Sequence, residues 1–258
     1  MILADFHTHT CFCDGHDKPE DVVLEAISRG MKKLGFSGHS YTPFDEVPCM
    51  SVINTEKYKI EIARLKREYK DKIQIFCGVE QDYYSELSTS DYDFVIGSVH
   101  YIHVNGRYYH VDNTPEMLRN LIHECNDDVY LMCEKYFALV SDVVNKTGAS
   151  IIGHFDLITK LNDKYNFFDE SNSRYIHAWK SAADNLLKTG KPFEINTGAV
   201  SRGYKSEPYP SREILKYIAE HKGSVILSSD SHDKANLMYK FNECEELAES
   251  LGLKIVEL

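Results

Sequence analysis

The chain carries a dense run of metal-ligand side chains close to its start. The stretch DFHTHTCFCDGHD (5–17) holds three histidines and three aspartates. Imidazole nitrogens and carboxylate oxygens are the usual protein ligands of zinc, manganese and iron ions. His7 and His9 form an H-x-H pair after an apolar run, and on a strand this spacing points both rings to the same side. The stretch therefore predicts one half of a metal site.

Residues of the same kinds end or follow the other short apolar runs of the chain. They are His39, Glu80, His100, His154, Asn196 leading to Arg202, and Asp230 with His232. Together with His7, His9 and His16, these positions account for seven of the 12 histidines. The other five are expected to be structural: His103, His110, His123, His177 and His221. Because ligand-type residues recur at the ends of successive apolar runs, we expect them to form one shared metal site.

Two kinds of periodicity alternate along the chain and predict the elements that position these residues. Apolar or β-branched runs typical of buried strands occur at 2–6, 33–37, 73–77, 94–99, 150–154, 192–196 and 224–229. Helical periodicity lies between them, at 19–30, 55–70, about 115–148, 173–190 and 211–223. Such alternation predicts an α/β fold with a mainly parallel sheet, either open or closed into a barrel. The carboxyl ends of parallel strands share one face, so the ligand-type residues should converge there.

Length and charge limit the class of protein. The 258 residues, 43% of them apolar, fit a single domain spanning 1–258. A formal charge of −11 disfavours a surface for nucleic acid or anionic membrane. No apolar run approaches the roughly 20 residues of a membrane span, and the start lacks the pattern of a secretory signal. We expect a cytoplasmic protein whose seven cysteines are reduced.

The motifs that hold these residues resemble those of a known family. DFHTHT, CDGH, GHS, GVE, GSVH, GHFD and SSDSH occur in the order typical of the PHP family, named for polymerase and histidinol phosphatase domains. The resemblance extends over residues 5–232 and is greatest to the stand-alone histidinol-phosphate phosphatases. It implies a distorted TIM-like (β/α)7 barrel, with the metal site at the carboxyl ends of the strands.

The same resemblance implies three divalent metal ions, which would be Zn, Mn or Fe. One ion would take His7, His9, Glu80 and Asp230, a second would share Glu80 with His100 and His154, and a third would take His16, His39 and His232. Glu80, Asp230 and His232 would be the catalytic residues. Arg202 would bind the phosphate of the substrate, and Asn196 and Tyr101 would also contact the substrate.

The implied activity is metal-dependent hydrolysis of a small phosphate monoester. The favoured reaction converts L-histidinol phosphate to L-histidinol and phosphate in histidine biosynthesis. An acidic or aromatic wall should then hold the leaving group, and the long irregular segments 40–54, 81–93 and 101–116 are suited to form it. The candidates for this wall are Asp45, Glu46, Tyr83, Tyr84 and Tyr101.

Three other functions fit parts of this pattern. A phosphoesterase of the same family that acts on nucleotides or oligonucleotides would need contacts to bases, and the acidic charge disfavours it mildly. An amidohydrolase also begins with H-x-H, but its binuclear form commonly needs a lysine at the end of the fourth strand, where this chain has GSVH. A metal-binding regulatory module without catalysis would have an incomplete ligand set, whereas every ligand position of the family is filled. The sequence does not indicate the oligomeric state.

Overall fold

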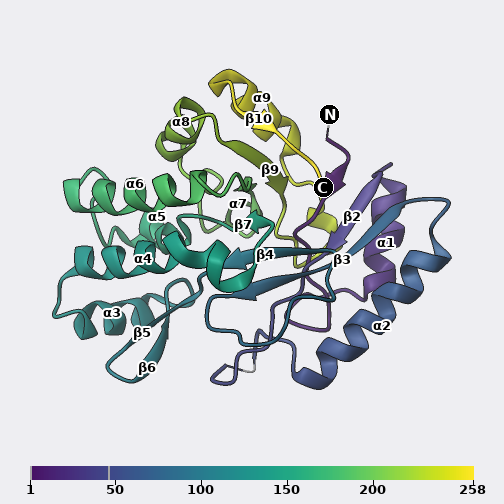
Figure 1. The fold of residues 1–258 in the computed structure, drawn as a ribbon, viewed down its shortest axis with the longest axis horizontal. Helices are drawn as coiled ribbons and strands as arrows, with labels where there is room; N and C mark the ends of the chain where they lie inside the picture. The colour runs from purple at the N-terminus through teal and green to yellow at the C-terminus, as the bar shows by residue number, and fades with distance from the viewer. Residues whose placement is uncertain (1, 46) are drawn as a thin grey trace.

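A curled parallel sheet organises the fold (Figure 1). The computed structural model describes residues 2–45 and 47–258, so the candidate wall residue Glu46 lies outside the described residues. Eight parallel strands form the sheet in the order β1-β2-β3-β4-β7-β8-β9-β10. Their bounds are β1 Ala4–Asp5, β2 Lys33–Phe36, β3 Gln74–Asp82, β4 Phe94–Ser98, β7 Ile151–Ile152, β8 Phe193–Asn196, β9 Ser224–Ser228 and β10 Lys254–Ile255. All seven predicted strand regions contain strands, and β10 is an eighth.

The sheet curls until the segment after β1 meets the segment after β9, so the fold is a distorted TIM-like α/β barrel, as predicted. Just past β1 and β9, Thr8 and Ser231 form a parallel bridge. The backbone N–H of His9 donates to Ser231 O at 2.8 Å, and the N–H of Ser231 donates to His7 O at 3.1 Å. β10 pairs with the first residues of β9, at the amino ends of the strands. After β10, the backbone oxygen of Leu258 accepts a hydrogen bond from Lys33 Nζ at 2.8 Å. The closure brings the first and last predicted ligands side by side.

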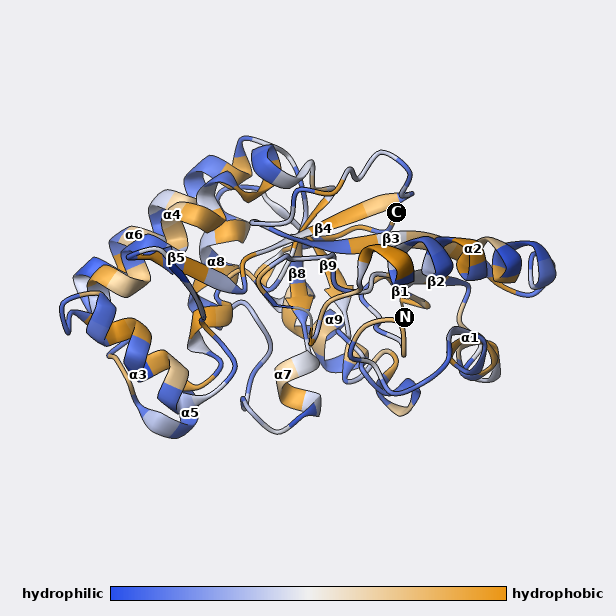
Figure 2. Ribbon diagram, turned by 90° about the horizontal axis from the view of Figure 1, so that it is seen from below, coloured by the Kyte–Doolittle hydropathy of each residue, from blue (hydrophilic) through white to orange (hydrophobic). Residues whose placement is uncertain are grey.

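Helices cover the outside of the sheet. They are α1 Pro19–Ser28, α2 Val52–Glu68, α3 Pro115–Glu124, α4 Val129–Thr147, α5 Asn162–Tyr165, α6 Ser173–Leu187, α7 Gly198–Ser201, α8 Arg212–Glu220 and α9 Phe241–Leu251, with 3₁₀ turns at Leu157–Thr159 and Lys234–Asn236. Figure 2 shows hydrophobic colour along β4, both blue and orange parts on β3, and alternating blue and orange turns on the helices. The helices therefore turn an apolar stripe toward the sheet.

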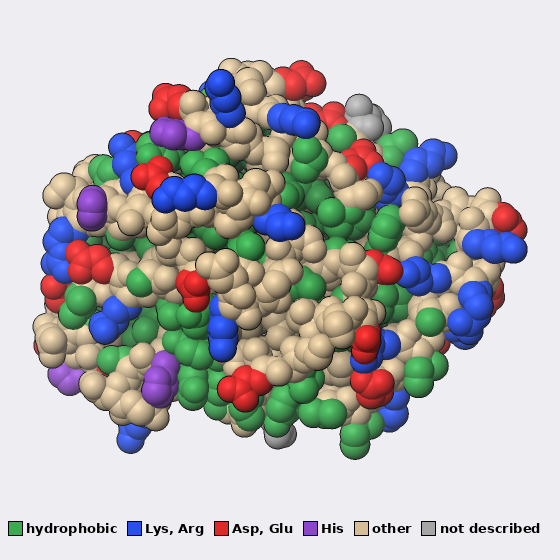
Figure 3. Space-filling model, in the orientation of Figure 1, with side chains coloured by type: hydrophobic (Ala, Val, Ile, Leu, Met, Phe, Trp, Pro, Cys, Tyr) green, Lys and Arg blue, Asp and Glu red, His purple; other side chains and the backbone are tan. Residues whose placement is uncertain are grey.

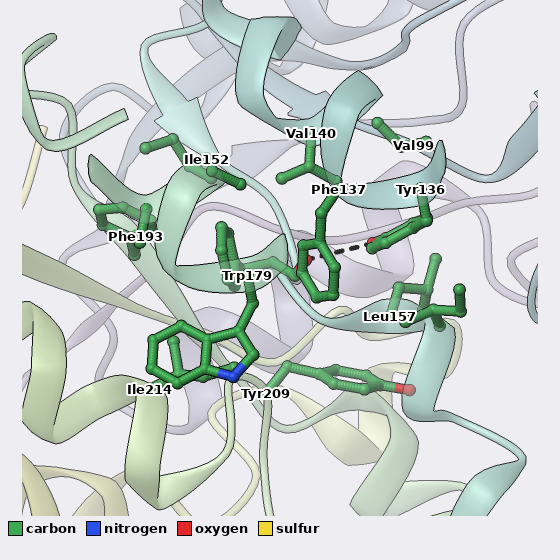
Figure 4. Packing of buried hydrophobic residues seen from close by; sticks show 14 of the residues in the cluster. Val99, Tyr136, Phe137, Val140, Ile152, Leu157, Trp179, Phe193, Tyr209 and Ile214 are labelled. Atoms are coloured by element: carbon green, nitrogen blue, oxygen red, sulfur yellow. Dashed lines mark hydrogen bonds between the residues drawn. The ribbon is translucent and has the colours of Figure 1, made fainter. Parts of the chain in front are cut away.

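The largest core cluster lies where α4 and α6 pack. On α6, Tyr175, Trp179 and Ala183 recur at four-residue spacing and are buried. Figure 4 shows part of this cluster, to which Trp179, Phe137 of α4 and Phe193 of β8 contribute. This apolar layer supports the strands that carry the carboxyl-end residues.

A second, smaller cluster fills the inside of the barrel beneath those carboxyl ends. It contains Phe6, Phe94 and Ile96, which come from β4 and the segment after β1. Gly78 of β3 makes room for it, because a Cβ on this residue would lie 2.3 Å from Phe94 Cζ. The barrel is thus filled with side chains below the site and open above it.

Besides β10 and the helices α5, α7 and α9, which were not predicted, the structure differs from the predicted elements in two places. The predicted helix at about 115–148 is two helices, because Asn126 and Asp127 have φ values of +59° and +57° and Asp128 caps α4. The predicted irregular segment 101–116 contains an antiparallel hairpin of β5 Tyr101–Val104 and β6 Arg107–His110. This hairpin stands beside the carboxyl-end face.

The distribution of surface charge and the state of the cysteines match what the sequence predicts. Basic and acidic side chains are interspersed over the face that Figure 3 shows. All seven cysteines lie in described segments and are free thiols. Across residues 2–45 and 47–258, no helix combines the length and the apolar character needed to cross a membrane.

Candidate metal centre

A cavity of about 980 Å³ opens at the carboxyl ends of the strands. Nine of the predicted site residues line it: His16, His39, Glu80, His100, Tyr101, His154, Arg202, Asp230 and His232. His7 and His9 lie just beneath, each with a side chain that is 0% exposed. The parallel topology therefore brings together groups that are as far apart in the chain as His7 and His232.

Glu80 of β3 is the central residue of the cavity floor. One carboxylate oxygen, Oε2, lies 2.8 Å from His39 Nδ1, 3.3 Å from His7 Nε2 and 3.5 Å from His9 Nε2. The other oxygen, Oε1, lies 2.8 Å from His154 Nε2 and 3.3 Å from His100 Nε2. The two oxygens thus face two separate groups of imidazoles. A bridging carboxylate between two cations requires this arrangement.

The first group, beneath Oε2, consists of His7, His9 and Asp230. Asp230 Oδ1 lies 3.3 Å from His9 Nε2 and 3.7 Å from His7 Nε2. Within the described part of the chain, His7 Nε2, His9 Nε2 and Glu80 Oε2 are buried without a hydrogen-bond partner. Buried polar atoms are rarely left unpaired in folded proteins. Three such atoms converging with a carboxylate form a donor set that fits a divalent cation.

The second group surrounds Glu80, with His100 and His154 at Oε1 and His39 at Oε2. Ligand atoms of His39, Glu80 and His100 all lie within 4.8 Å of one another, and His154 approaches the same carboxylate. His39 also contacts the third group described below. It therefore stands between two of the positions at which a cation could be held.

The third group differs from the predicted one, because it gains His9 and Asp14 and lacks the ring of His16. Ligand atoms of His9, Asp14, His39 and His232 lie within 4.8 Å of one another. Asp14 Oδ2 is 3.3 Å from His232 Nε2, and Asp14 Oδ1 is 3.6 Å from His39 Nε2. His16 is exposed, and its backbone N–H donates to His232 O at 2.8 Å. The structure brings His39 and His232 together but does not bring the ring of His16 into their group, so its role as a ligand stays a prediction.

Asp14 was not predicted, although a signal for it existed. It is the carboxylate of the motif CDGH, five residues after His9 and two before His16. Burial opposes its ionisation, but His39, His232 and His9 hold the pKa of the Asp14 carboxyl far below its usual range. The anion that results compensates positive charge at this group.

A second layer of carboxylates orients the imidazoles, and sequence reasoning missed it. Glu194 of β8 is fully buried, and its Oε1 accepts a hydrogen bond from His7 Nδ1 at 2.7 Å. Asp82 Oδ2 accepts from the His100 backbone N–H at 3.0 Å and lies 3.2 Å from His100 Nδ1. A carboxylate on the far nitrogen fixes the tautomer and the ring orientation of a metal-binding histidine. The signal for Glu194 was a charged residue inside the apolar strand PFEIN.

The central carboxylates are held as anions. Burial raises the pKa of Glu80, but His39, His7 and His100 outweigh that effect and keep it well below its usual range. Burial likewise opposes the charge on Asp230, but Arg202 and His7 keep its pKa well below the usual value. Deprotonated oxygens are the form that binds cations.

Arg202 lies at the rim of the first group. Its Nη2 donates to Asp230 Oδ2 at 3.0 Å, and its Nη1 donates to Asp230 O at 2.7 Å. Gly198 leaves space for this contact, because a Cβ there would lie 2.5 Å from Asp230 Oδ2. The guanidinium faces the cavity while it holds a candidate ligand. A contact with phosphate stays a prediction.

The other predicted substrate contacts occupy different places. Asn196 is fully buried, its Nδ2 donates to Glu194 Oε2 at 3.1 Å, and its Oδ1 accepts from the Gly198 N–H at 2.9 Å. This placement suits orientation of Glu194 and does not favour direct contact with substrate. Tyr101 lines the cavity beside His100, together with Asp45. Tyr83 turns away, with its hydroxyl donating to Asp142 Oδ2 at 3.2 Å.

Known proteins share this chain's pattern and fold. The model of the PHP domain matches residues 5–198. "Probable histidinol-phosphatase" of Schizosaccharomyces pombe is 29% identical, covering 96% of this chain and 86% of that protein. "Histidinol-phosphatase" of Bacillus subtilis is 25% identical, covering 93% of this chain and 97% of that protein.

A solved structure of histidinol phosphate phosphatase from Lactococcus lactis has a similar fold. It superimposes with a TM-score of 0.76 at 23% identity, covering 98% of this chain and 95% of that one. That protein was solved in complex with zinc, L-histidinol and phosphate. The PHP model spans most of the length over which the ligand-type residues were found, from β1 to α7. This chain therefore belongs to the PHP domain family.

Proposed function

We propose that this protein hydrolyses L-histidinol phosphate to L-histidinol and phosphate, with divalent metal ions held on the cavity floor. The observation that carries the proposal is Glu80, whose two oxygens face two separate groups of imidazoles. The unpartnered Nε2 atoms of His7 and His9 support it, because they face carboxylate oxygens, and a cation between them would satisfy the nitrogen lone pairs and the oxygens together. The names of the relatives, which match nearly end to end, support the choice of substrate.

We further propose three ions in this centre. His7, His9, Glu80 and Asp230 would hold the first, Glu80, His100 and His154 the second, and His39, His232 and His16 the third, with Asp14 beside them. Zinc suits these nitrogen and oxygen donors, as do manganese and iron. The groups draw on residues from β1 to the segment after β9, so we also assign residues 1–258 to a single domain.

The chain's own residues would then position the reaction. Divalent ions supply Lewis acidity, which acidifies water and offsets negative charge on a phosphoryl group. Glu80 and Asp230 fix the cation positions and keep the floor anionic enough to hold them. Arg202 would donate N–H groups to the phosphoryl oxygens from the rim, and His232 stands beside it as a group able to move a proton. Filling of the barrel below the site excludes water from that side.

A substrate panel with defined metals tests the proposal. The protein is stripped with a chelator and reloaded with Zn, Mn or Fe separately, and hydrolysis of histidinol phosphate, glycerol phosphate and nucleoside monophosphates is measured. Preference for histidinol phosphate together with close to three bound ions per chain is the expected result. Activity that survives complete metal removal, or a preference for nucleotides, would overturn it.

A further inference from the structure

The wall of the cavity next to His100 contains a second built site. It is formed by Asp45 of the segment 40–50 and by Tyr101 and His110 of the β5–β6 hairpin, and all three residues line the cavity. Asp45 Oδ2 accepts a hydrogen bond from Tyr101 OH at 3.0 Å and pairs with His110 Nε2 at 2.5 Å. The rings of Tyr101 and His110 lie 4.4 Å apart. We call these three residues the distal site.

Aromatic rings frame the distal site. Phe44 and Tyr108 stack face to face, with ring centroids 3.7 Å apart and an interplanar angle of 2°. Phe44 also meets Tyr101 edge-on at 4.9 Å. Aromatic faces attract cations and provide apolar surface for a planar ring. The combination of carboxylate and aromatic rings therefore fits a small cationic group with a flat ring.

Asp45 differs from the other carboxylates of the cavity in its partner. Asp112 forms an ion pair with Lys160 at 2.8 Å, and Asp82 is bonded to His100, next to the metal groups. The Asp45 carboxylate instead pairs with an imidazole outside the metal groups, that of His110 in the hairpin at the cavity edge. A substrate imidazole or ammonium offers the same donors to the same oxygen. His110 thus occupies the place that such a group would take.

The separation between the two sites suits a small leaving group. Tyr101 follows His100 directly in the chain, and the two ring centroids are 6.3 Å apart. The distal site is therefore one side chain away from a proposed metal ligand. A phosphoryl group held over the metals would leave the alcohol portion of a small ester facing Asp45.

We propose that Asp45 determines substrate specificity by binding the cationic amine or imidazole of the leaving group. Tyr101 positions the carboxylate, and His110 covers it until the substrate displaces the ring. This inference rests on the proposed function, since histidinol carries both an ammonium group and an imidazole. It also assigns a role in substrate binding to His110, which was expected to be structural.

The test compares two substrates and one product. For the wild type and Asp45→Asn, kcat/KM is measured with histidinol phosphate and with glycerol phosphate, and histidinol is titrated as a competitive inhibitor. Asp45→Asn should lower kcat/KM for histidinol phosphate about 10–100-fold, mainly through KM, which is the scale of losing a charge-assisted hydrogen bond. The inhibition constant of histidinol should rise by a similar factor. Glycerol phosphate, whose leaving group carries no cation, should lose a much smaller factor in kcat/KM than histidinol phosphate does.

Three further variants separate recognition from structure. Tyr101→Phe should weaken histidinol binding less than Asp45→Asn does, because the carboxylate remains. His110→Gln should tighten histidinol binding, because a competing ring is removed. Asp71→Asn, in an exposed turn, is the matched control and should match the wild type. Metal content and thermal melting are measured for each variant.

The outcomes distinguish this inference from the proposed function. If Asp45→Asn keeps the preference for histidinol phosphate, or loses both substrates equally, the inference is wrong while the proposed function stands. A His110→Gln variant that loses histidinol as strongly as Asp45→Asn also contradicts it, since His110 would then be the contact. If the wild type shows no preference but histidinol inhibits it through Asp45, the distal site is supported and the proposed substrate is wrong.

Discussion

Replacement of Glu194 by glutamine tests whether the buried second layer controls the metal centre. The Glu194 carboxylate accepts three hydrogen bonds from groups of the site. Oε1 accepts from His7 Nδ1 at 2.7 Å, while Oε2 accepts from the His154 backbone N–H at 2.9 Å and from Asn196 Nδ2 at 3.1 Å. Glutamine keeps the shape of the side chain but has only one acceptor oxygen. Either orientation of its amide turns an NH₂ group toward a buried donor.

The loss of stability in Glu194→Gln follows from the number of buried donors that lose an acceptor. A buried donor left without its acceptor costs about 1–3 kcal/mol, so the free energy of unfolding of the metal-free protein should fall by about that amount. His7 would also lose the carboxylate that fixes its ring. Loss of such a partner lowers metal affinity by about 10–100-fold. The melting temperature should fall by several degrees for a chain of this size.

Two measurements check both consequences. Chemical denaturation of the metal-free protein gives the change in stability, and titration with zinc against a competing chelator gives the change in affinity. Glu246→Gln on the exposed face of α9 is the matched control. Wild-type zinc affinity in Glu194→Gln would refute the view that Glu194 orients a metal ligand, even if the stability falls.

Three substitutions on the cavity floor and rim carry further predictions. Glu80→Gln should remove bound metal, measured by elemental analysis, and abolish turnover while the fold persists by circular dichroism; full metal content would mean that Glu80 is not a bridge. Gly198→Ala should displace the Asp230 carboxylate, since the new Cβ would lie 2.5 Å from Oδ2, and so lower both metal content and kcat; wild-type values would show that the backbone can shift. Arg202→Ala should lower kcat/KM by about 10²–10³-fold, with Lys rescuing it only in part, and an unchanged kcat/KM would exclude a phosphate contact. Because Arg202 also holds Asp230, metal content is measured in the same samples.

The buried strands could be predicted because they bury nearly every residue. Runs such as FVIGS of β4 have no exposed face and read as continuous apolar sequence. The β5–β6 hairpin was missed because it is half exposed and its strand RYYH has little apolar contrast. A signal was nevertheless present in Asn105-Gly106, whose φ values of +50° and +77° match the two-residue turns that favour Asn-Gly.

The break between α3 and α4 could not be read from periodicity. Both helices continue the same apolar spacing on either side of Cys125, so a 3.6-residue pattern fits the whole region. The decisive features are local and polar: left-handed backbone at Asn126 and Asp127, and the cap at Asp128. Short polar side chains tolerate that backbone and compete with helical hydrogen bonds.

The candidate ligands were predictable because they follow strands, whereas the groups that orient them were not. Position after a buried strand is visible in the sequence. The partners Glu194 and Asp14 depend on which ring nitrogen a carboxylate reaches, and this is a property of packing. His110 illustrates the same limit, since nothing in RYYH shows that its ring meets a carboxylate from the segment 40–50. Residues of these types are common on protein surfaces, so type alone cannot identify them.

The order of the strands explains why the chain order of the ligands was informative. From β1 to β4, neighbours in the sheet are also neighbours in the sequence, so His39, Glu80 and His100 stand side by side. Glu80 is bridged to His39 on one side and in register with Ile96 of β4 on the other. Its central place therefore follows from parallel pairing alone. Contact between the first and last ligands has a different origin, because it depends on the Thr8–Ser231 closure, which joins segments at opposite ends of the chain. A sequence pattern can predict the order of the candidate ligands along the sheet. The curl of the sheet, which the pattern does not show, brings the first and the last of them together.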